Sequence, residues 1–260
     1  MPLAFDSHGS GPPLVLLHGT GGQRGMWDPV VGTLGRERRV IALDLPGFAG
    51  SADVAFDATP DGYTSWLEGW FAEQGLGRPH VAGNSMGGGI VLELARRGAV
   101  ASATALSPVG FWTARELTYA QQSLRAARAI VKVTRPAMPA LTRSAAGRVA
   151  LLSQIYAKPW RLSADEALGI IDAFADAPAF EPALHGFADY HLRDGDELRG
   201  VPVTVAWGTR DWLLIPRQAQ RARRMLPWAQ HVALRGCGHV PCHDDPEAVA
   251  AVLLAGSREG

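Results

Sequence analysis

The sequence has little of what defines several large classes of protein. Its only cysteines are Cys237 and Cys242, too few for a disulfide scaffold and in keeping with a reducing cytoplasm. No window approaches about 18 consecutive apolar residues, and the N-terminal stretch lacks the basic and apolar segments of a signal peptide. We therefore expect a soluble, cytoplasmic protein that does not insert into membranes.

An imbalance of charge is also missing. Lys plus Arg and Asp plus Glu each number 25, so the formal net charge is zero, and nothing favours a nucleic acid or an acidic membrane as partner. Hydrophobic residues make up 47% of the 260 residues, enough for the core of one α/β domain with a modest insertion. The expected partner is a small-molecule substrate, and a homodimer stays open.

Apolar runs of strand length alternate with longer helix-like segments, a pattern typical of a mostly parallel sheet flanked by helices. Strands are expected at residues 13–19, 39–47, 80–85, 103–110, 202–208 and 230–239, and one more within 3–9, which gives seven or eight in all. Helices are expected at 26–34, 63–74, 86–97, 216–226 and 246–254. Most of the strands end in glycine, proline or a polar residue, so we expect chemistry at their carboxyl ends.

Residues 112–198 interrupt this alternation. Their apolar positions recur at helical spacing, and no buried strand intervenes, so we interpret them as a helical cap inserted into a core of residues 1–111 and 199–260. Charge is sorted along the cap: residues 112–161 hold nine basic residues and one acidic, and residues 162–198 hold nine acidic and one basic. We expect the two halves to face each other as solvated helix surfaces.

A serine surrounded by glycines lies in the stretch VAGNSMGGG, residues 81–89. Gly83, Ser85 and Gly87 fit G-x-S-x-G, the pattern of a sharp strand-to-helix turn that exposes a nucleophilic serine. The two glycines are needed because larger residues there would collide with neighbouring chain segments. The alternative is a glycine-rich turn before an ordinary helix, and the rest of the chain has to decide between the two.

A serine nucleophile needs a base, and the base needs an orienting carboxylate. His239 follows the last apolar strand in GCGHVP, and Asp211 follows the preceding strand in AWGTRDW. The order serine, aspartate, histidine is the one expected for a nucleophile elbow. We therefore predict Ser85, Asp211 and His239 as the catalytic residues.

The oxyanion that such a serine creates needs backbone N–H donors prepared for it. One is expected from Met86, directly after the nucleophile, and the other from Thr20, in the loop HGTGG that follows an early apolar strand. Gly19 and Gly21 flank Thr20 and let the backbone approach a substrate carbonyl closely, so we expect both glycines to contact the substrate.

Five segments in this order resemble the α/β-hydrolase superfamily, in its branch of small cap-bearing serine hydrolases. They are HG at 18–19, DLPGFAGS at 44–51, the elbow, GTRD at 208–211 and GCGH at 236–239. The resemblance implies the α/β-hydrolase fold, an acyl-enzyme on Ser85, no cofactor or metal, and a supporting role for His18 beneath the oxyanion loop. Ala49 departs from it, since relatives commonly have glycine there, and the usual first strand has no counterpart.

The resemblance leaves the cleaved bond open. Hydrolysis of an ester or lactone of a small to medium apolar substrate ranks first. The elbow GNSMGG is similar to that of hydrolases that cleave carbon-carbon bonds of meta-cleavage products, but those commonly carry tryptophan after the histidine, where this chain has Val240. An acyl transferase or perhydrolase would use the same residues. A non-catalytic ligand-binding protein ranks last, because such descendants usually lose a triad member.

A pocket between core and cap is expected to be mostly apolar, which directs attention to large side chains near it. In the cap, we predict substrate contacts from Trp112, Met138 and Trp160. Beside the catalytic residues, we predict them from Trp212 and Val240.

The segment CGHVPCH, residues 237–243, could be mistaken for a zinc site. Its ligands are tightly spaced in sequence and His239 already serves the triad, so we predict no metal. Cys237 is expected as a buried thiol, and Cys242 as a surface or half-buried one.

Overall fold

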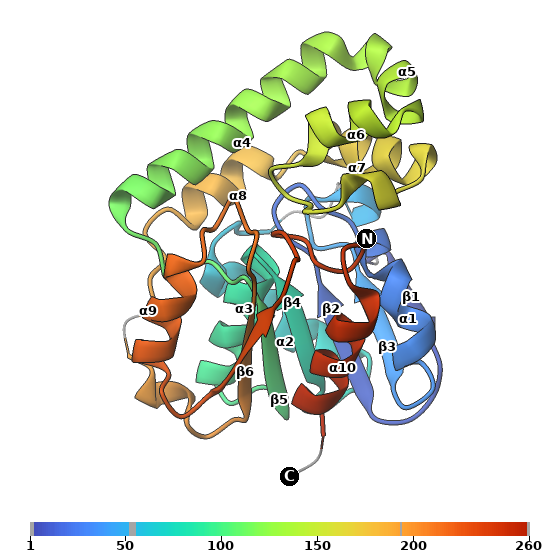
Figure 1. Cartoon of the computed structure of the whole chain (residues 1–260). Helices are drawn as coiled ribbons and strands as arrows, with labels where there is room; N and C mark the ends of the chain where they lie inside the picture. The colour runs from blue at the N-terminus through green and yellow to red at the C-terminus, as the bar shows by residue number, and fades with distance from the viewer. Residues whose placement is uncertain (1–2, 52–55, 193, 259–260) are drawn as a thin grey trace.

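A sheet of seven strands organises the chain, which the computed structural model describes at residues 3–51, 56–192 and 194–258 (Figure 1). The strands are β1 Phe5–His8, β2 Pro13–Leu17, β3 Arg39–Leu43, β4 His80–Asn84, β5 Ser102–Leu106, β6 Val203–Gly208 and β7 Gln230–Leu234. Their order in the sheet is β1-β3-β2-β4-β5-β6-β7, and only the pair β1–β3 is antiparallel. The predicted mostly parallel sheet is confirmed, with seven strands.

Parallel pairing brings the carboxyl ends of β2, β4, β6 and β7 to one edge of the sheet. Each of these ends leads into a loop with predicted site residues. The last strand is shorter than predicted and ends at Leu234, because Gly236 has φ 72°, a left-handed conformation that turns the chain out of the sheet. His239 therefore lies on a loop beyond the strand.

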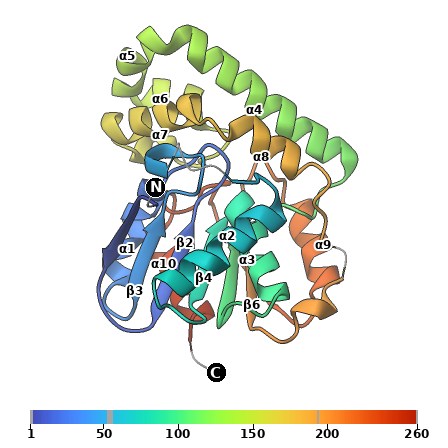
Figure 2. The ribbon, with the colours of Figure 1, turned by 180° about the vertical axis from the view of Figure 1, so that it is seen from behind.

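The two faces of the sheet bury alternate side chains, as the two-residue period of a strand requires. In β2, Val15 and Leu17 join one apolar cluster, and Leu14 and Leu16 join the other. Helices α2, α3 and α9 cover the first face, and α1 and α10 cover the second (Figures 1 and 2). Their bounds are α1 Asp28–Leu34, α2 Pro60–Glu73, α3 Met86–Arg96, α9 Arg217–Met225 and α10 Pro246–Gly256, with 3-10 turns η1 Arg24–Trp27 and η2 Ala49–Ser51.

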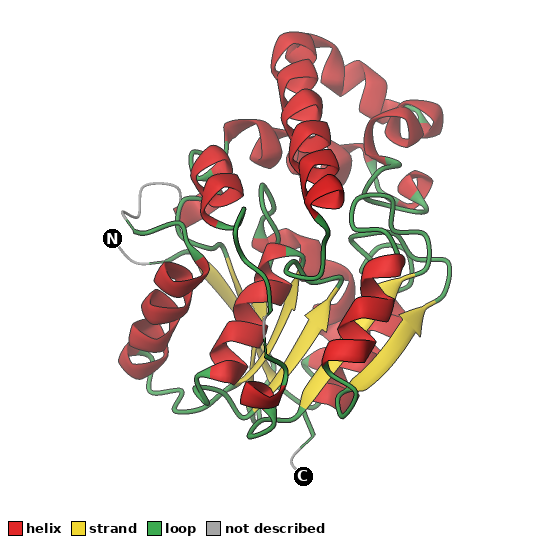
Figure 3. Ribbon diagram, turned by 90° about the vertical axis from the view of Figure 1, so that its left-hand side faces the viewer, coloured by secondary structure: helices red, strands yellow, loops and turns green. Residues whose placement is uncertain are grey.

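Five helices stand between β5 and β6 in sequence and are called the inserted helices below. They are α4 Ala114–Thr134, α5 Met138–Arg143, α6 Ala145–Leu152, α7 Ala164–Asp176 and α8 Phe180–Gly186, with 3-10 turns η3 Arg135–Ala137, η4 Pro159–Arg161 and η5 Asp196–Leu198 along the same stretch. They form a separate layer above the carboxyl ends of the strands (Figures 1 and 3). Val131, Met138, Leu152 and Ile171 belong to an apolar cluster within this layer. None of the helices in the described ranges is long and apolar enough to cross a membrane.

Candidate active site

Ser85 occupies the turn between β4 and α3 in a strained conformation, with φ 58° and ψ −115°. Both flanking glycines are sterically required. A Cβ on Gly83 would lie 2.2 Å from the carbonyl oxygen of Gly87, and a Cβ on Gly87 would lie 2.4 Å from the carbonyl oxygen of Leu17. The strand, turn and helix predicted around this serine are therefore present, and they hold it at the sheet's carboxyl edge.

The carboxylate of Asp211 is fully used. Its Oδ2 lies 2.8 Å from His239 Nδ1, and its Oδ1 accepts hydrogen bonds from the N–H groups of Leu213 and Leu214, at 2.9 and 2.8 Å. Asp211 and His239 are both buried. A carboxylate at this position favours the tautomer with the proton on Nδ1, which leaves Nε2 free to accept a proton from a substrate or a serine.

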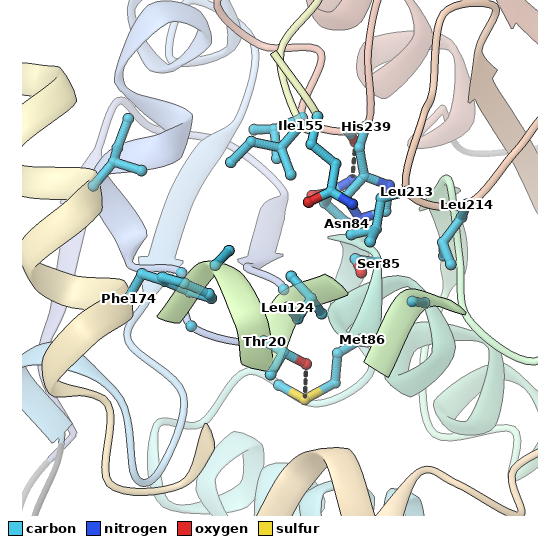
Figure 4. A pocket seen from close by; sticks show the side chains of 18 of the residues that line it. Thr20, Asn84, Ser85, Met86, Leu124, Ile155, Phe174, Leu213, Leu214 and His239 are labelled. Atoms are coloured by element: carbon cyan, nitrogen blue, oxygen red, sulfur yellow. Dashed lines mark hydrogen bonds between the residues drawn. The ribbon is translucent and has the colours of Figure 1, made fainter. Parts of the chain in front are cut away.

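His239 is also tied to the serine's own strand. Its carbonyl oxygen accepts a hydrogen bond of 2.8 Å from Nδ2 of Asn84, the residue before Ser85. Ser85 and His239 line one cavity and lie near each other in it (Figure 4). Among the described residues, no hydrogen bond involves the Ser85 hydroxyl, which is compatible with catalysis because such bonds often tighten only when substrate is present.

Two backbone N–H groups beside the serine lack a partner. Among the described residues, neither Thr20 N nor Met86 N donates a hydrogen bond. The two residues are joined through their side chains, since Thr20 Oγ1 lies 3.3 Å from Met86 Sδ (Figure 4). Gly19 lets this loop come close, because a Cβ there would lie 2.9 Å from Ser85 Cβ. Unpaired donors beside a possible nucleophile form the arrangement expected of an oxyanion hole.

His18 supports the loop from below. Its Nδ1 donates to the carbonyl oxygen of Gly19 at 2.7 Å, and its Nε2 accepts from the N–H of Leu45 at 2.9 Å. Complete burial lowers the pKa of His18, against smaller opposing effects of the Gly19 carbonyl and the Asp44 carboxylate. A neutral imidazole with both nitrogens engaged is suited to holding the loop and not to acting as a second base.

A cavity of about 160 Å³ lies between the sheet's carboxyl edge and the inserted helices. Its polar lining residues beside the sheet are Thr20, Gln23, Asn84, Ser85 and His239, and those of the inserted stretch are Gln121, Gln154 and Tyr156. No Asp, Glu, Lys or Arg is among the residues that line it, and most of its wall is apolar. Burying a charge without a partner is costly, so the cavity suits an uncharged, largely apolar molecule.

The cavity brings together part of the predicted substrate contacts. The cavity lining includes four of the seven predicted contact residues, Gly19, Gly21, Trp112 and Val240. It does not include the other three, Met138, Trp160 and Trp212. Met138 is buried in the inserted helices' own cluster, and Trp160 and Trp212 are 51% and 65% exposed.

The cavity instead receives residues that the sequence did not single out. Leu213 and Leu214 enter it where Trp212 was expected, because their N–H groups bind Asp211 and fix the turn with the tryptophan outside. From the inserted helices, Leu124 and Phe174 reach it (Figure 4). Helical spacing marked both as apolar positions, but spacing alone does not tell which apolar side chain faces a cavity and which faces another helix.

The side chains of the segment CGHVPCH point to different partners. His239 binds Asp211, and His243 Nε2 lies 3.5 Å from Glu166 Oε1. Burial raises the pKa of the Cys237 thiol to about 11 and shifts that of Cys242 further in the same direction. Cys242 is fully buried, which corrects the expectation of a surface or half-buried thiol. Within the described ranges, no three His, Cys, Asp or Glu side chains gather as metal ligands.

Comparisons with known proteins agree with this architecture. An uncharacterized protein of Mycobacterium tuberculosis is 27% identical over 94% of this chain and 74% of its own length. The dihydrolipoyllysine-residue acetyltransferase component of the acetoin cleaving system of Pseudomonas putida is 30% identical over 96% of this chain and 64% of its own. A thermophilic esterase of Thermogutta terrifontis, solved with malate bound, is 25% identical with a TM-score of 0.76, over 97% of this chain and 92% of that one.

A sequence profile described as the alpha/beta hydrolase family matches residues 14–252, nearly the whole chain. The profile spans β2 to α10, with the elbow, the Asp211 turn and the His239 loop between them. The predicted fold and family are confirmed: the chain belongs to the alpha/beta hydrolase family.

Proposed function

We propose that the protein is a serine hydrolase that cleaves a carboxylic ester or lactone through an acyl-enzyme on Ser85. Ser85 Oγ attacks the carbonyl carbon while His239 Nε2 takes the hydroxyl proton, and Asp211 holds the imidazole in the required tautomer. The same proton then goes to the leaving alkoxide. Water attacks the acyl-enzyme with His239 again as base, and this releases the acid and restores Ser85. The observation that carries the proposal is the Asp211–His239 pair, 2.8 Å apart and buried, in one cavity with the strained serine.

The oxyanion of each tetrahedral intermediate falls to the N–H groups of Thr20 and Met86. Both are without a partner among the described residues, so neither has to break a bond before it donates. Met86 begins α3, whose N-terminal end adds a favourable partial positive charge. The proposed chemistry uses the chain's own residues and needs no cofactor or metal.

An uncharged apolar substrate is supported by the lining of the cavity, which contains no Asp, Glu, Lys or Arg. We assign residues 1–111 and 199–260 to a catalytic core and residues 112–198 to a cap that closes the cavity from above. Trp112 and Phe174 would contact the substrate from the cap, and Gly19, Gly21 and Val240 from the core.

The second candidate is hydrolysis of a carbon-carbon bond in a meta-cleavage product, and the elbow sequence GNSMGG favours it. Against it stand Val240 after the histidine, where the similar enzymes commonly have tryptophan, and the cavity's lack of a cationic side chain for an anionic substrate. The ester or lactone therefore ranks first.

The test compares wild type with Ser85→Ala on p-nitrophenyl esters of increasing acyl length. Turnover in wild type and its loss in the variant, by about 10³-fold or more, are expected because the serine, base and acid act as one unit. Labelling of Ser85 by a fluorophosphonate, with no turnover of any ester, would move the proposal to the carbon-carbon bond. No labelling and no turnover would leave a ligand-binding protein.

A further inference from the structure

Asp244 is a buried carboxylate five residues beyond His239, outside the lining of the cavity. It accepts three backbone hydrogen bonds. Oδ2 receives the N–H of Gly238 at 2.7 Å and that of Ala157 at 2.9 Å, and Oδ1 receives the N–H of Lys158 at 2.7 Å. Gly238 directly precedes His239, whereas Ala157 and Lys158 follow α6 in the inserted segment. One carboxylate thus joins the histidine loop to the segment above it.

The residue on the other side of His239 is held by the same segment. The N–H of Val240 donates to the carbonyl oxygen of Ile155 at 2.8 Å. The packing is close, since a Cβ on Gly238 would lie 2.7 Å from Ala157 N and 2.8 Å from the carbonyl oxygen of Ile155. Residues 155–158, called the clamp segment below, therefore fix both neighbours of the histidine.

Charge supports this arrangement. The carbonyl oxygen of Asp244 accepts Lys158 Nζ at 2.8 Å and Arg161 Nη1 at 2.6 Å. Two cations thus lie beside the residue whose carboxylate is buried, and three N–H donors occupy its oxygens, which offsets the cost of burial. The group is fully satisfied without any ligand, so its role is to hold chain segments together.

We propose that Asp244 is a positioning residue for the base. It keeps His239 aligned with Ser85 by binding Gly238 to the clamp segment, so the base is competent only while the inserted helices sit in this place. The inference rests on the proposed function, because it assigns the clamp to a catalytic histidine. The proposed role of Asp244 differs from that of Asp211. Asp211 orients the imidazole ring of His239, whereas Asp244 fixes the backbone that carries the ring.

Asp244→Asn is the main test, because it exchanges one acceptor oxygen for an NH₂ group that would face a backbone N–H. Asp245→Asn is the matched control. Among the described residues, the Asp245 carboxylate accepts one hydrogen bond, from the N–H of Ala248 at the start of α10, a capping role that asparagine also fills. Both changes remove one negative charge from the same loop. Turnover of the best p-nitrophenyl ester is divided by the concentration of sites that a fluorophosphonate titrates, so that misfolded protein does not count.

Asp244→Asn should lower kcat per titrated site by about 10- to 100-fold with KM within about threefold, because a misplaced base slows chemistry more than binding. Asp245→Asn should keep the wild-type kcat. Gly238→Ala, whose methyl group would push the clamp segment away, should act like Asp244→Asn and serves if that variant does not fold. Equal kcat per site in Asp244→Asn and Asp245→Asn would overturn the inference while Ser85→Ala still tests the proposed function. A wild type that neither turns over nor labels would overturn both.

Discussion

The core meets the cavity with polar groups in fixed places, whereas the inserted helices meet it mostly with apolar side chains. On the core side, Ser85 is held by steric exclusion around two glycines and His239 by hydrogen bonds to Asp211 and Asn84. On the other side, the side chains of Leu124 and Phe174 provide apolar contact area but no directional hydrogen bonds. We therefore expect the core to determine which reaction can occur and the inserted helices to determine which molecule fits.

Their outer surfaces differ as well. The core exposes two of the large hydrophobic side chains that lie at the described surface, Phe5 and Trp212. The inserted segment exposes the others, Tyr119, Ile130, Val133, Leu141, Val149 and Trp160. Its two halves, which we expected to face each other as solvated surfaces, are joined partly by ion pairs: Arg125 with Glu181, and Arg135 with Asp172 and Asp176. Exposed pairs of this kind contribute about 0–1 kcal/mol each, so contacts with the core matter more to the layer's position.

Asp211→Asn is expected to have the largest effect. An amide NH₂ facing His239 Nδ1 would force the proton onto Nε2, where it can no longer accept the proton of Ser85. We expect kcat to fall by about 10³- to 10⁴-fold, equivalent to about 4 to 5.5 kcal/mol, while the fold survives. Ester turnover and far-UV circular dichroism check this, and full activity would show that the acid lies elsewhere.

Adding a methyl group to a glycine should have opposite effects in the two regions. Gly87→Ala would place a Cβ 2.4 Å from the Leu17 carbonyl oxygen, a backbone atom that cannot move aside, and should cost about 3 kcal/mol or more. Gly169→Ala, within α7, would meet only Gln23 Nε2 at 3.7 Å and should stabilise by up to about 1 kcal/mol. Urea unfolding measures both. A tolerant Gly87 would mean that the elbow is looser than its geometry indicates.

The sequence allowed the site residues of the core to be predicted, but not which apolar residues of the inserted helices reach the cavity. The site residues of the core sit in motifs whose glycines follow from backbone geometry and whose order is the one expected for a nucleophile elbow, so Ser85 and its neighbours could be placed. Met138 and Leu124 could not be told apart, because both are apolar positions on helices and only packing decides which one reaches the cavity. The role of the Asp244 carboxylate carried no signal, since its three partners are backbone N–H groups, two of them far away in sequence.

Phe174→Ala tests the claim that the inserted helices set the size of the substrate. The Phe174 ring lies over Gly21 in the cavity wall, so its removal opens space beside the oxyanion loop. The ratio of kcat/KM for a long to a short acyl ester should rise about tenfold, since one or two methylenes are worth about 1–3 kcal/mol in such a pocket. Ile130→Ala, on the exposed side of α4, should leave the ratio unchanged. An unchanged ratio in Phe174→Ala would place the acyl chain elsewhere.

Acid should weaken the core through His18. Burial lowers the pKa of His18 below the ordinary 6.5. Below pH 6.5, His18 therefore binds a proton in the unfolded chain more readily than in the folded protein. The free energy of unfolding therefore has its full value above pH 6.5 and decreases as the pH falls below it. Burial also lowers the pKa of His243, which changes the free energy of unfolding in the same direction. Urea midpoints from pH 8 to 5 should decline, and His18→Gln should flatten the decline. A variant with an undiminished slope would assign the effect to other groups.

The smallest effect is expected for Val133→Thr, and the same substitution at Val15 provides the comparison between the two regions. Val133 is 82% exposed on α4, and Val15 is fully buried in β2. Valine to threonine keeps the branched shape and adds a hydroxyl. At Val15 the hydroxyl loses water without gaining a planned partner and should cost about 1–3 kcal/mol. At Val133 the hydroxyl stays hydrated, so the free energy of unfolding should change by no more than about 0.5 kcal/mol. Because the two variants differ only in surroundings, a cost at Val133 as large as that at Val15 would mean that this face of α4 is covered in solution.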